Sequence, residues 1–319
     1  MVAWGSALNA KFHQAYLIHN PFAGRIRKNP QLLAHVEEIL APLASEWRRS
    51  STPAPGTAGR LAEEAVGAGA DLIVALGGDG TINEVIQGMA GTNATLGILP
   101  AGTANVLAME TGIGGNLMRA ARRMASCVPV DVPLGCLHEQ GGEARLFVAM
   151  AGAGLDARIV RRVKPEIKRK FGKLSYWVAG FGALGEQLPE FLVRLDGREY
   201  RASFALFSRV RNYGGDLEIA RHADLLRDDL GVVLFEGENS FRYLKYFTGV
   251  LFNRLPQMKG VHVLHGRNAE LVTLNGRAVD LQLDGEYAGL APARVMLSET
   301  HVRLLLPAAF VARSGRGPS

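Results

Sequence analysis

The sequence predicts an α/β domain with a mostly parallel sheet, followed by a β-rich antiparallel domain. The chain has 319 residues, of which 48% are hydrophobic, and this composition is sufficient for two cores. In the first part, apolar strands alternate with helical stretches, whereas short strands separated by glycines dominate from Asp131 onward. The change in pattern places a domain boundary near residue 132.

Three strands and two helices are predicted in the first domain. Short apolar runs at 15–18, 72–76 and 96–99 have the length and branched composition of buried parallel strands. Stretches rich in alanine and glutamate at 31–43 and 58–68 are predicted to be helices. This alternation places helices on both faces of a parallel sheet.

The second half is predicted to contain short antiparallel strands and one prominent helix. Residues 241–255 carry apolar side chains at helical spacing, with Arg242, Lys245 and Arg254 between them. This pattern favours a helix that covers a core over one that binds a surface. The predicted strands cover 145–150, 191–195, 203–208, 232–235, 269–273 and 281–283.

A glycine-rich turn follows the strand at 72–76. Gly77, Gly78 and Gly80 remove side chains that would keep a phosphate from the backbone amides, and a helix predicted to begin near Thr81 adds its positive end. Asp79 would repel a phosphate unless a divalent cation or a proton lay between them. The turn therefore predicts a magnesium-dependent phosphoryl-transfer site, because the alternative, a capped strand-to-helix connection, does not need three glycines.

Further motifs along the chain resemble those of one family. Residues 20–24 read Asn-Pro-Phe-Ala-Gly, and 96–108 contain Pro-Ala-Gly-Thr after a strand. Later motifs lie at 148–157, 212–215, 228–230 and 283–286. With these motifs in this order, the chain resembles the diacylglycerol kinase catalytic-domain family, which includes soluble bacterial lipid kinases, sphingosine kinases and ceramide kinases. The resemblance covers about residues 15–306.

The resemblance implies the fold in more detail. It implies a three-layer ATP-binding α/β domain at 12–132 and a β-sandwich-like lipid-substrate domain at 133–301, with the active site in the interdomain cleft. It also implies that 302–311 return to the first domain, where 302–306 add a strand. Residues 312–319 are predicted to be a disordered tail.

The resemblance also implies which residues bind ATP. Residues 77–83 cradle the phosphates, Asn20 and Gly24 lie at the end of the first strand, Thr103 lines the opposite wall, and Thr52 contacts the nucleotide. The full set of implied ATP-binding residues is Asn20, Gly24, Thr52, Gly77, Gly78, Asp79, Gly80, Thr81, Asn83 and Thr103.

Glu286 and Asp79 are the catalytic residues that the resemblance implies. Glu286 ends the Asp-Gly-Glu motif and is the expected general base for the lipid hydroxyl, while Asp79 completes the polar centre. Without the other motifs, residues 284–286 would indicate an ordinary hairpin turn.

Two departures from the family pattern concern the metal and nucleotide contacts. A second, structural Mg²⁺ is expected on Asp228 with the backbones of Leu225 and Leu230, but the chain reads Arg-Asp-Asp-Leu where the family has Asp-Gly-x-Leu. Val106 follows Asn105 where the family often has Asp, so one contact is missing. Sphingosine kinases, which also lack that Asp, are the better comparison for this loop.

The sequence therefore predicts an ATP- and Mg²⁺-dependent lipid kinase. The leading candidate for the acceptor is diacylglycerol, which would give phosphatidic acid. A sphingoid base or ceramide is the second candidate, and phosphatidylglycerol is the third. A soluble-metabolite kinase of the NAD kinase type shares the Gly-Gly-Asp-Gly turn, but Asn83-Glu84 after it favours the lipid kinases. Intact Asp79 and Glu286 disfavour a catalytically silent lipid-binding protein. The acceptor and the oligomeric state, including a homodimer, stay open.

Charge and targeting signals predict a cytoplasmic protein that binds membranes peripherally. The net charge is +6, and basic residues crowd 161–173 just before Tyr176 and Trp177. Cations beside interfacial aromatics suit an anionic membrane surface better than nucleic acid, and a solvated helix face is the alternative. Two cysteines, no signal sequence and no apolar run of membrane-spanning length agree with this location.

Overall fold

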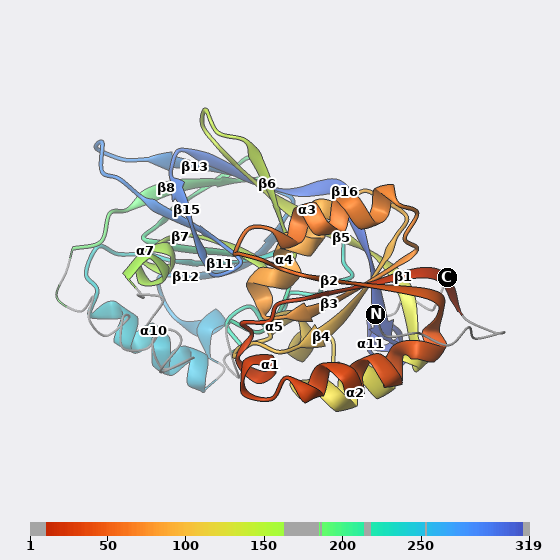
Figure 1. The fold of residues 1–319 in the computed structure, drawn as a ribbon. Helices are drawn as coiled ribbons and strands as arrows, with labels where there is room; N and C mark the ends of the chain where they lie inside the picture. The colour runs from red at the N-terminus through yellow and green to blue at the C-terminus, as the bar shows by residue number, and fades with distance from the viewer. Residues whose placement is uncertain (1–10, 163–184, 186, 214–217, 253, 315–319) are drawn as a thin grey trace. The chain divides into compact units, whose positions relative to one another are not determined.

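The chain forms two compact units. The computed structural model describes residues 11–162, 185, 187–213, 218–252 and 254–314 (Figure 1). Unit 1 comprises Met1–Pro133 and Thr300–Ser319, and unit 2 comprises Leu134–Glu299. The chain passes between the units within two long strands, β5 (Cys127–Glu139) and β16 (Ala293–Pro307).

Unit 1 contains a parallel sheet with the strand order β2-β1-β3-β4-β16. Three of its strands correspond to the predicted apolar runs, and the end of β16 pairs in parallel with β4. The edge strand β2 was not predicted, because only its Ala44 and Trp47 are buried and its remaining residues are polar. The strands before β16 are β1 (Phe12–His19), β2 (Ala44–Ser51), β3 (Leu72–Gly77) and β4 (Thr95–Pro100).

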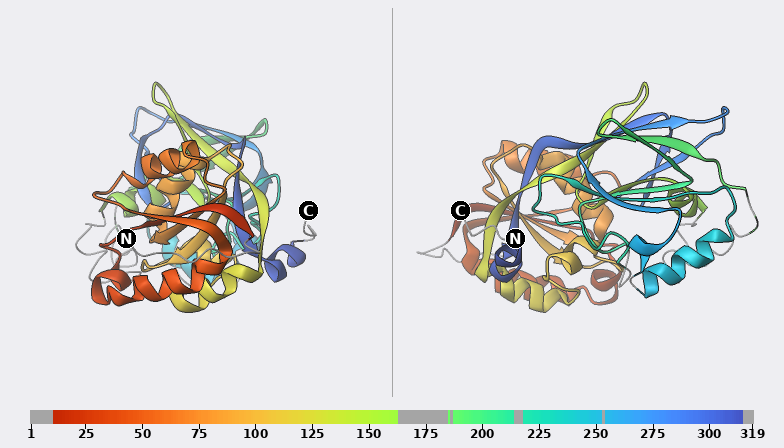
Figure 2. Two further views of the ribbon diagram at one scale, coloured as in Figure 1. Left: turned by 45° about the vertical axis from the view of Figure 1, so that its right-hand side comes forward. Right: turned by 180° about the vertical axis from the view of Figure 1, so that it is seen from behind.

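Helices cover both faces of this sheet, as Figure 2 shows for unit 1. Helices α3 and α4 pack on one face, and α2 and α6 pack on the other. Gly59 and Gly88 let α3 and α4 approach closely, since a Cβ on Gly88 would lie 2.0 Å from the Gly59 carbonyl oxygen. The helices are α1 (Gly24–Lys28), α2 (Gln31–Leu40), α3 (Ala58–Gly67), α4 (Asp79–Met89), α5 (Val106–Glu110) and α6 (Leu117–Arg123).

The C-terminal segment ends in a short helix, α11 (Ala308–Arg313). Phe310 and Val311 are buried, which anchors this turn of helix to unit 1. The helix continues two residues into the segment that the sequence analysis expected to be a disordered tail, and that expectation is therefore wrong for Ala312 and Arg313.

Unit 2 contains two antiparallel groups of strands. One has the order β16-β13-β8-β9, with β5 and β6 attached, and the other has the order β12-β11-β10-β7-β14-β15. The strands are β6 (Ala144–Phe147), β7 (Met150–Gly154), β8 (Phe191–Leu195), β9 (Arg198–Ala202), β10 (Phe204–Ser208), β11 (Leu230–Phe235), β12 (Val261–Gly266), β13 (Asn268–Thr273), β14 (Asp280–Leu283) and β15 (Glu286–Leu290).

One apolar core joins the two sheets of unit 2. Phe147 and Phe191 come from the first sheet, Phe207 and Leu281 come from the second, and all four are buried in one cluster. The described part of unit 2 also contains the helices α7 (Leu155–Arg162) and α10 (Arg242–Leu251). The structure therefore confirms the predicted mostly parallel α/β domain followed by an antiparallel sandwich.

Candidate functional site

The glycine-rich turn forms the start of helix α4. The helix begins at Asp79, two residues earlier than the sequence predicted, and Gly78 is its N-cap. Gly78 has no side chain with which to cap α4, and Gly78, Asp79 and Gly80 are partly exposed. An N-terminus of this kind presents backbone amides and a partial positive charge to an anion.

Two of the glycines are required by close contacts. A Cβ on Gly77 would lie 2.5 Å from the Thr81 side chain, and a Cβ on Gly102 would lie 2.5 Å from Cα of Gly78. At Gly78 and Gly102 the loop after β3 and the loop after β4 therefore meet through backbone atoms. A side chain at Gly78 or Gly102 would push the two loops apart.

Asp79 joins these two loops. Its Oδ2 accepts the backbone N–H of Asn105 at 2.9 Å, and its Oδ1 accepts the N–H of Val106 at 2.6 Å. Asn105 has a left-handed φ of 49°, and its side chain bonds the N–H and carbonyl of Gly102 at 2.9 and 3.0 Å. The bond uses the backbone of residue 106, so it does not depend on which side chain this residue carries.

Asn20 connects the first strand to the same turn. Its Nδ2 donates to Oγ1 of Thr81 at 3.2 Å, and its Oδ1 accepts the N–H of Phe22 at 2.8 Å. Burial lowers the pKa of the neighbouring His19, so its ring is neutral at pH 7 and adds no charge here. Asn20, Thr81 and the glycine turn therefore form one cluster at the ends of β1 and β3.

The other predicted ATP-binding residues have different environments. Thr52 is buried, and its N–H extends the β1–β2 pairing by bonding the His19 carbonyl at 3.0 Å. Asn83 accepts a bond from Gln87 at 3.1 Å on the surface of α4. Gly24 and Thr103 are exposed, and Thr103 directly follows Gly102 in the loop after β4.

Glu84 has a role that the sequence analysis missed. Its Oε1 accepts the N–H of Gly56 at 2.8 Å, and its Oε2 accepts the N–H of Ala58 at 2.9 Å. The N-cap Thr57 makes no side-chain bond to α3, and the Glu84 carboxylate instead accepts the N–H of Ala58, the first residue of this helix, together with one N–H of the preceding loop. The sequence analysis noted Glu84 only as the residue after Asn83. It gave no sign of the contact with Ala58, which lies 26 residues earlier.

The Asp-Gly-Glu motif forms the two-residue turn between β14 and β15. Asp284 and Gly285 have φ values of 47° and 82°. The Asp284 carboxylate accepts the backbone N–H groups of Val148, Ala149 and Met150 at 3.2, 3.0 and 2.7 Å. These bonds separate β6 from β7 where one strand had been predicted.

Glu286 lies beside this turn as the first residue of β15. Its side chain is exposed and, within the part of the chain that the structure describes, it makes no hydrogen bond or ion pair. Asp284 is therefore held in place by three amides, whereas the Glu286 carboxylate is available to accept a proton. The sequence motif alone did not separate these two roles.

The predicted second metal site has a different occupant. Leu225, Asp228 and Leu230 lie just before or at the start of β11, and the Leu225 carbonyl accepts a bond from the Arg209 guanidinium at 2.5 Å. Among the described residues, no three His, Cys, Asp or Glu side chains cluster in a way that could hold a metal. The Leu225 carbonyl is already engaged by a guanidinium, and a positive charge at this distance does not suit a bound cation.

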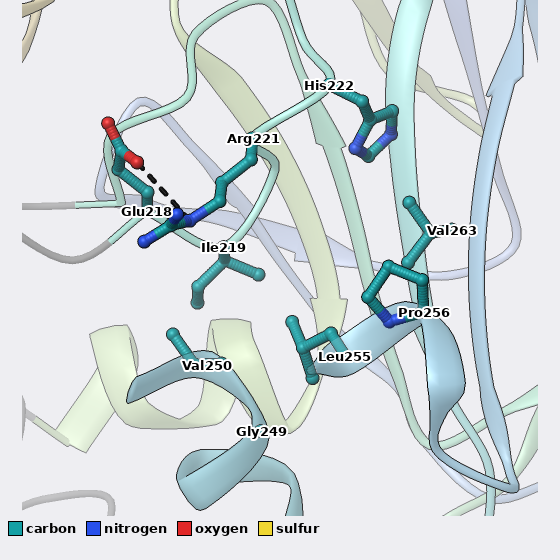
Figure 3. A pocket seen from close by; sticks show the side chains of 9 residues that line it. All are labelled: Glu218, Ile219, Arg221, His222, Gly249, Val250, Leu255, Pro256 and Val263. Atoms are coloured by element: carbon teal, nitrogen blue, oxygen red, sulfur yellow. Dashed lines mark ion pairs between the residues drawn. The ribbon is translucent and has the colours of Figure 1, made fainter. Parts of the chain in front are cut away.

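A pocket of about 90 Å³ lies in unit 2 between α10 and β12 (Figure 3). Glu218 and Arg221 form an ion pair of 3.3 Å at its edge, and its inner wall is apolar. Sites for drug-sized ligands usually enclose several hundred Å³, so this pocket is too small for a nucleotide. The lining residues are Glu218, Ile219, Arg221, His222, Gly249, Val250, Leu255, Pro256 and Val263, and none was predicted as a site residue.

The basic stretch at 161–173 is described only at its first two residues. Arg161 donates from Nη1 to Oδ1 of Asp280 at 2.8 Å, so this arginine is engaged within unit 2. Residues 163–173, with Tyr176 and Trp177, lie outside the described part of the chain. The described helices include none with the length and apolar composition needed to cross a membrane.

Known proteins resemble both halves of the chain. A family model described as "Diacylglycerol kinase catalytic domain" matches residues 14–136, and one described as "YegS C-terminal NAD kinase beta sandwich-like domain" matches residues 149–306. A diacylglycerol kinase of Bacillus subtilis is 28% identical over 302 residues, which cover 92% of this chain and 96% of that protein. A diacylglycerol kinase of Mycobacterium tuberculosis is 28% identical over 260 residues, covering 77% of this chain and 80% of that protein.

Solved structures share the fold over almost the whole chain. A crystal structure of a diacylglycerol kinase from Bacillus anthracis has a TM-score of 0.73 and 22% identity, covering 94% of this chain and 99% of that one. A further structure from the same organism has a TM-score of 0.80 and covers 95% of this chain and 98% of that one. The two family models match in order along one chain, and residues 14–136 form a domain of the diacylglycerol kinase catalytic-domain family.

Proposed function

We propose that the protein is an ATP- and Mg²⁺-dependent lipid kinase that transfers the γ-phosphate to a hydroxyl of a membrane lipid. Diacylglycerol is the proposed acceptor, and phosphatidic acid is the product. The observation that carries the proposal is the contact between Gly78 and Gly102 at the start of α4, which keeps side chains away from the helix's first amides. A phosphate chain is the ligand that such an arrangement suits.

The proposed phosphate cradle consists of the first turn of α4 and the two loops beside it. The amides of residues 78–81 would bind phosphate oxygens, with Asn20 holding Thr81 in place through its 3.2 Å bond. Asp79 fixes the loop after β4 against this turn through Asn105 and Val106. Preorganised donors of this kind favour charge that develops during phosphoryl transfer.

The donor chemistry at Asp79 fits a magnesium ion. Mg²⁺ prefers carboxylate and amide oxygens, and a carboxylate can accept about four hydrogen bonds or ligands. The two backbone bonds of Asp79 are therefore compatible with a cation, and Asp79 and Asn83 would hold it. When bound, Mg²⁺ would neutralise charge on the phosphates.

Glu286 is proposed as the general base. Its exposed carboxylate would take the proton of the acceptor hydroxyl as that oxygen attacks the γ-phosphorus and ADP leaves. Asp284 would act as a positioning residue, because its three backbone bonds fix the turn that presents Glu286.

Helix α10 supports docking on an anionic membrane surface. Tyr246 and Val250 are buried, as a helix that covers a core requires, but Phe241, Leu244 and Phe252 are 57%, 40% and 73% exposed. The helix (Figure 1, left) carries Arg242 and Lys245 and has no acidic residue. Exposed apolar groups with flanking cations suit the interface of an anionic bilayer, to which the protein would bind peripherally.

The acceptor is tested directly with the purified full-length protein. It is incubated with ATP labelled at the γ-phosphate, with vesicles containing diacylglycerol, sphingosine, ceramide and phosphatidylglycerol, and with NAD. Label in phosphatidic acid supports the proposal. Label in another lipid replaces the acceptor, and label in a soluble product alone favours a metabolite kinase, to which the name of the second family model also points.

A further inference from the structure

Arg209 is a fully buried cation in unit 2, with an exposed fraction of 0%. It directly follows β10, and its own N–H bonds the Ala149 carbonyl at 2.8 Å. Burying a guanidinium is costly unless its N–H groups find acceptors. The hydrogen bonds of the Arg209 guanidinium therefore show which part of the protein this buried charge stabilises.

The guanidinium binds a curved segment of backbone through three carbonyls. Nη1 donates to the carbonyls of Arg227 and Asp229 at 2.7 and 2.5 Å, and Nη2 donates to that of Leu225 at 2.5 Å. Three carbonyl dipoles of the segment 225–229 thus face one buried positive charge. Convergence of backbone carbonyls on a cation is also how proteins bind divalent metals.

We propose that Arg209 replaces a structural divalent cation in this chain. The segment it holds is the one on which a second Mg²⁺ was expected, and Leu225 is common to both sets of donors. A divalent cation there would compete for the Leu225 carbonyl with a fixed guanidinium and be repelled by it. The structural order of this segment therefore needs no metal.

The neighbouring groups are also bonded within the protein. The Asp228 carbonyl accepts from Nη1 of Arg267 at 2.8 Å, and the Asp229 carboxylate is paired with Arg227 at 2.8 Å and His265 at 3.1 Å. Leu230 is paired with Gly266 in the β11–β12 ladder. Internal contacts fix this part of unit 2 without a metal.

The test measures thermal stability of the full-length protein without nucleotide, so that catalytic Mg²⁺ does not enter. At matched ionic strength, we expect the Tm of the wild type to be the same in 5 mM MgCl₂ as in EDTA, and the dialysed protein to contain no stoichiometric metal. A saturable rise in Tm with Mg²⁺ that is lost in Asp228→Asn would overturn the proposal.

The second part of the test is substitution of Arg209. Arg209→Met should lower Tm by about 10 °C, because the carbonyls of Leu225, Arg227 and Asp229 lose their donor. Arg267→Met is the matched control, since it removes an exposed arginine from a carbonyl of the same segment, and it should change Tm little. An Arg209→Met protein as stable as the control would also overturn the proposal, and if that variant does not fold, the metal titration of the wild type still decides.

Discussion

Val106 donates its backbone N–H to Oδ1 of Asp79 across 2.6 Å, and this bond joins the start of α5 to the start of α4. Asn105 adds a second bond to Oδ2 at 2.9 Å. A carboxylate at a helix N-terminus is stabilising through both its hydrogen bonds and its charge. Asp79 therefore holds the loop after β4 in addition to its proposed part in phosphoryl transfer.

This double role leads to a prediction for Asp79→Ala. The variant should retain less than a tenth of the lipid phosphorylation rate, and the free energy of unfolding should fall by about 1–2 kcal/mol because two amides lose a charged acceptor. Initial rates with labelled ATP and thermal denaturation measure the two effects. Asp79→Asn, which keeps one acceptor oxygen, should lose the activity with a smaller loss of stability. A rate above a tenth of wild type would remove Asp79 from the mechanism.

Gly102 gives a test of the contact between the two loops. In Gly102→Ala the new Cβ would meet Cα of Gly78 at 2.5 Å and Oδ1 of Asn105 at 3.1 Å, so the loops must separate. We expect the KM for ATP to rise about tenfold and the free energy of unfolding to fall by about 1–3 kcal/mol.

Gly67→Ala is the control for this substitution. Gly67 ends α3 with nothing within 4 Å of an added Cβ, so alanine there should leave both quantities unchanged or raise stability slightly. An unchanged KM in Gly102→Ala would mean that the loop contact has no part in nucleotide binding.

The fold was predictable where the hydrophobic pattern was strong. Residues 72–76 form a buried apolar strand, and residues 191–195 form a strand in which Phe191, Val193 and Leu195 are buried and Arg194 is exposed. Both were predicted within one residue. The edge strand β2 was missed because its sequence Ser-Glu-Trp-Arg-Arg buries only Trp47. Residues 145–150 were predicted as one strand because the signal that divides them, Asp284, lies far along the chain.

The site was predictable where a residue type determines backbone geometry. Three glycines predicted the connection from strand to helix from local sequence alone, although α4 begins at Asp79 and Gly80 lies inside it. The partners of Glu84 and Arg209 were not predictable, because each side chain binds backbone carbonyls or amides whose positions depend on the tertiary fold. In the sequence, a carboxylate or guanidinium that stabilises the fold cannot be distinguished from one that takes part in catalysis.

The exposed face of α10 predicts how the protein binds membranes. Replacing Leu244 and Phe252 by serine should weaken binding to vesicles rich in phosphatidylglycerol. The binding free energy should fall by about 1 kcal/mol for each of these exposed side chains that enters the bilayer interface. Lys245→Gln should reduce the salt dependence of binding. Vesicle sedimentation measures both.

Leu290→Ser is the matched control for the α10 variants, because Leu290 is an equally exposed leucine on β15 of the same unit. It should sediment with vesicles like the wild type. Equal binding by the Leu244 and Phe252 double variant would show that α10 does not contact the bilayer.

Glu286 and Asp284 are separated by one residue but differ in their contacts. This difference allows substitutions to distinguish a residue that takes part in the reaction from one that holds the turn in place. Glu286→Gln keeps the shape of an exposed side chain but cannot accept a proton, so kcat should fall about a hundredfold to ten-thousandfold. The KM for ATP and Tm should stay unchanged, because Glu286 has no partner within the described part of the chain.

Asp284→Asn should behave in the opposite way. Its carboxylate accepts three amides, and an amide side chain offers one oxygen in place of two, so Tm should fall by several degrees. Its kcat should fall less than that of Glu286→Gln, since the base itself remains. Near-wild-type turnover in Glu286→Gln would exclude Glu286 as the base, and a parallel loss of ATP affinity would instead place this residue in the nucleotide or metal site.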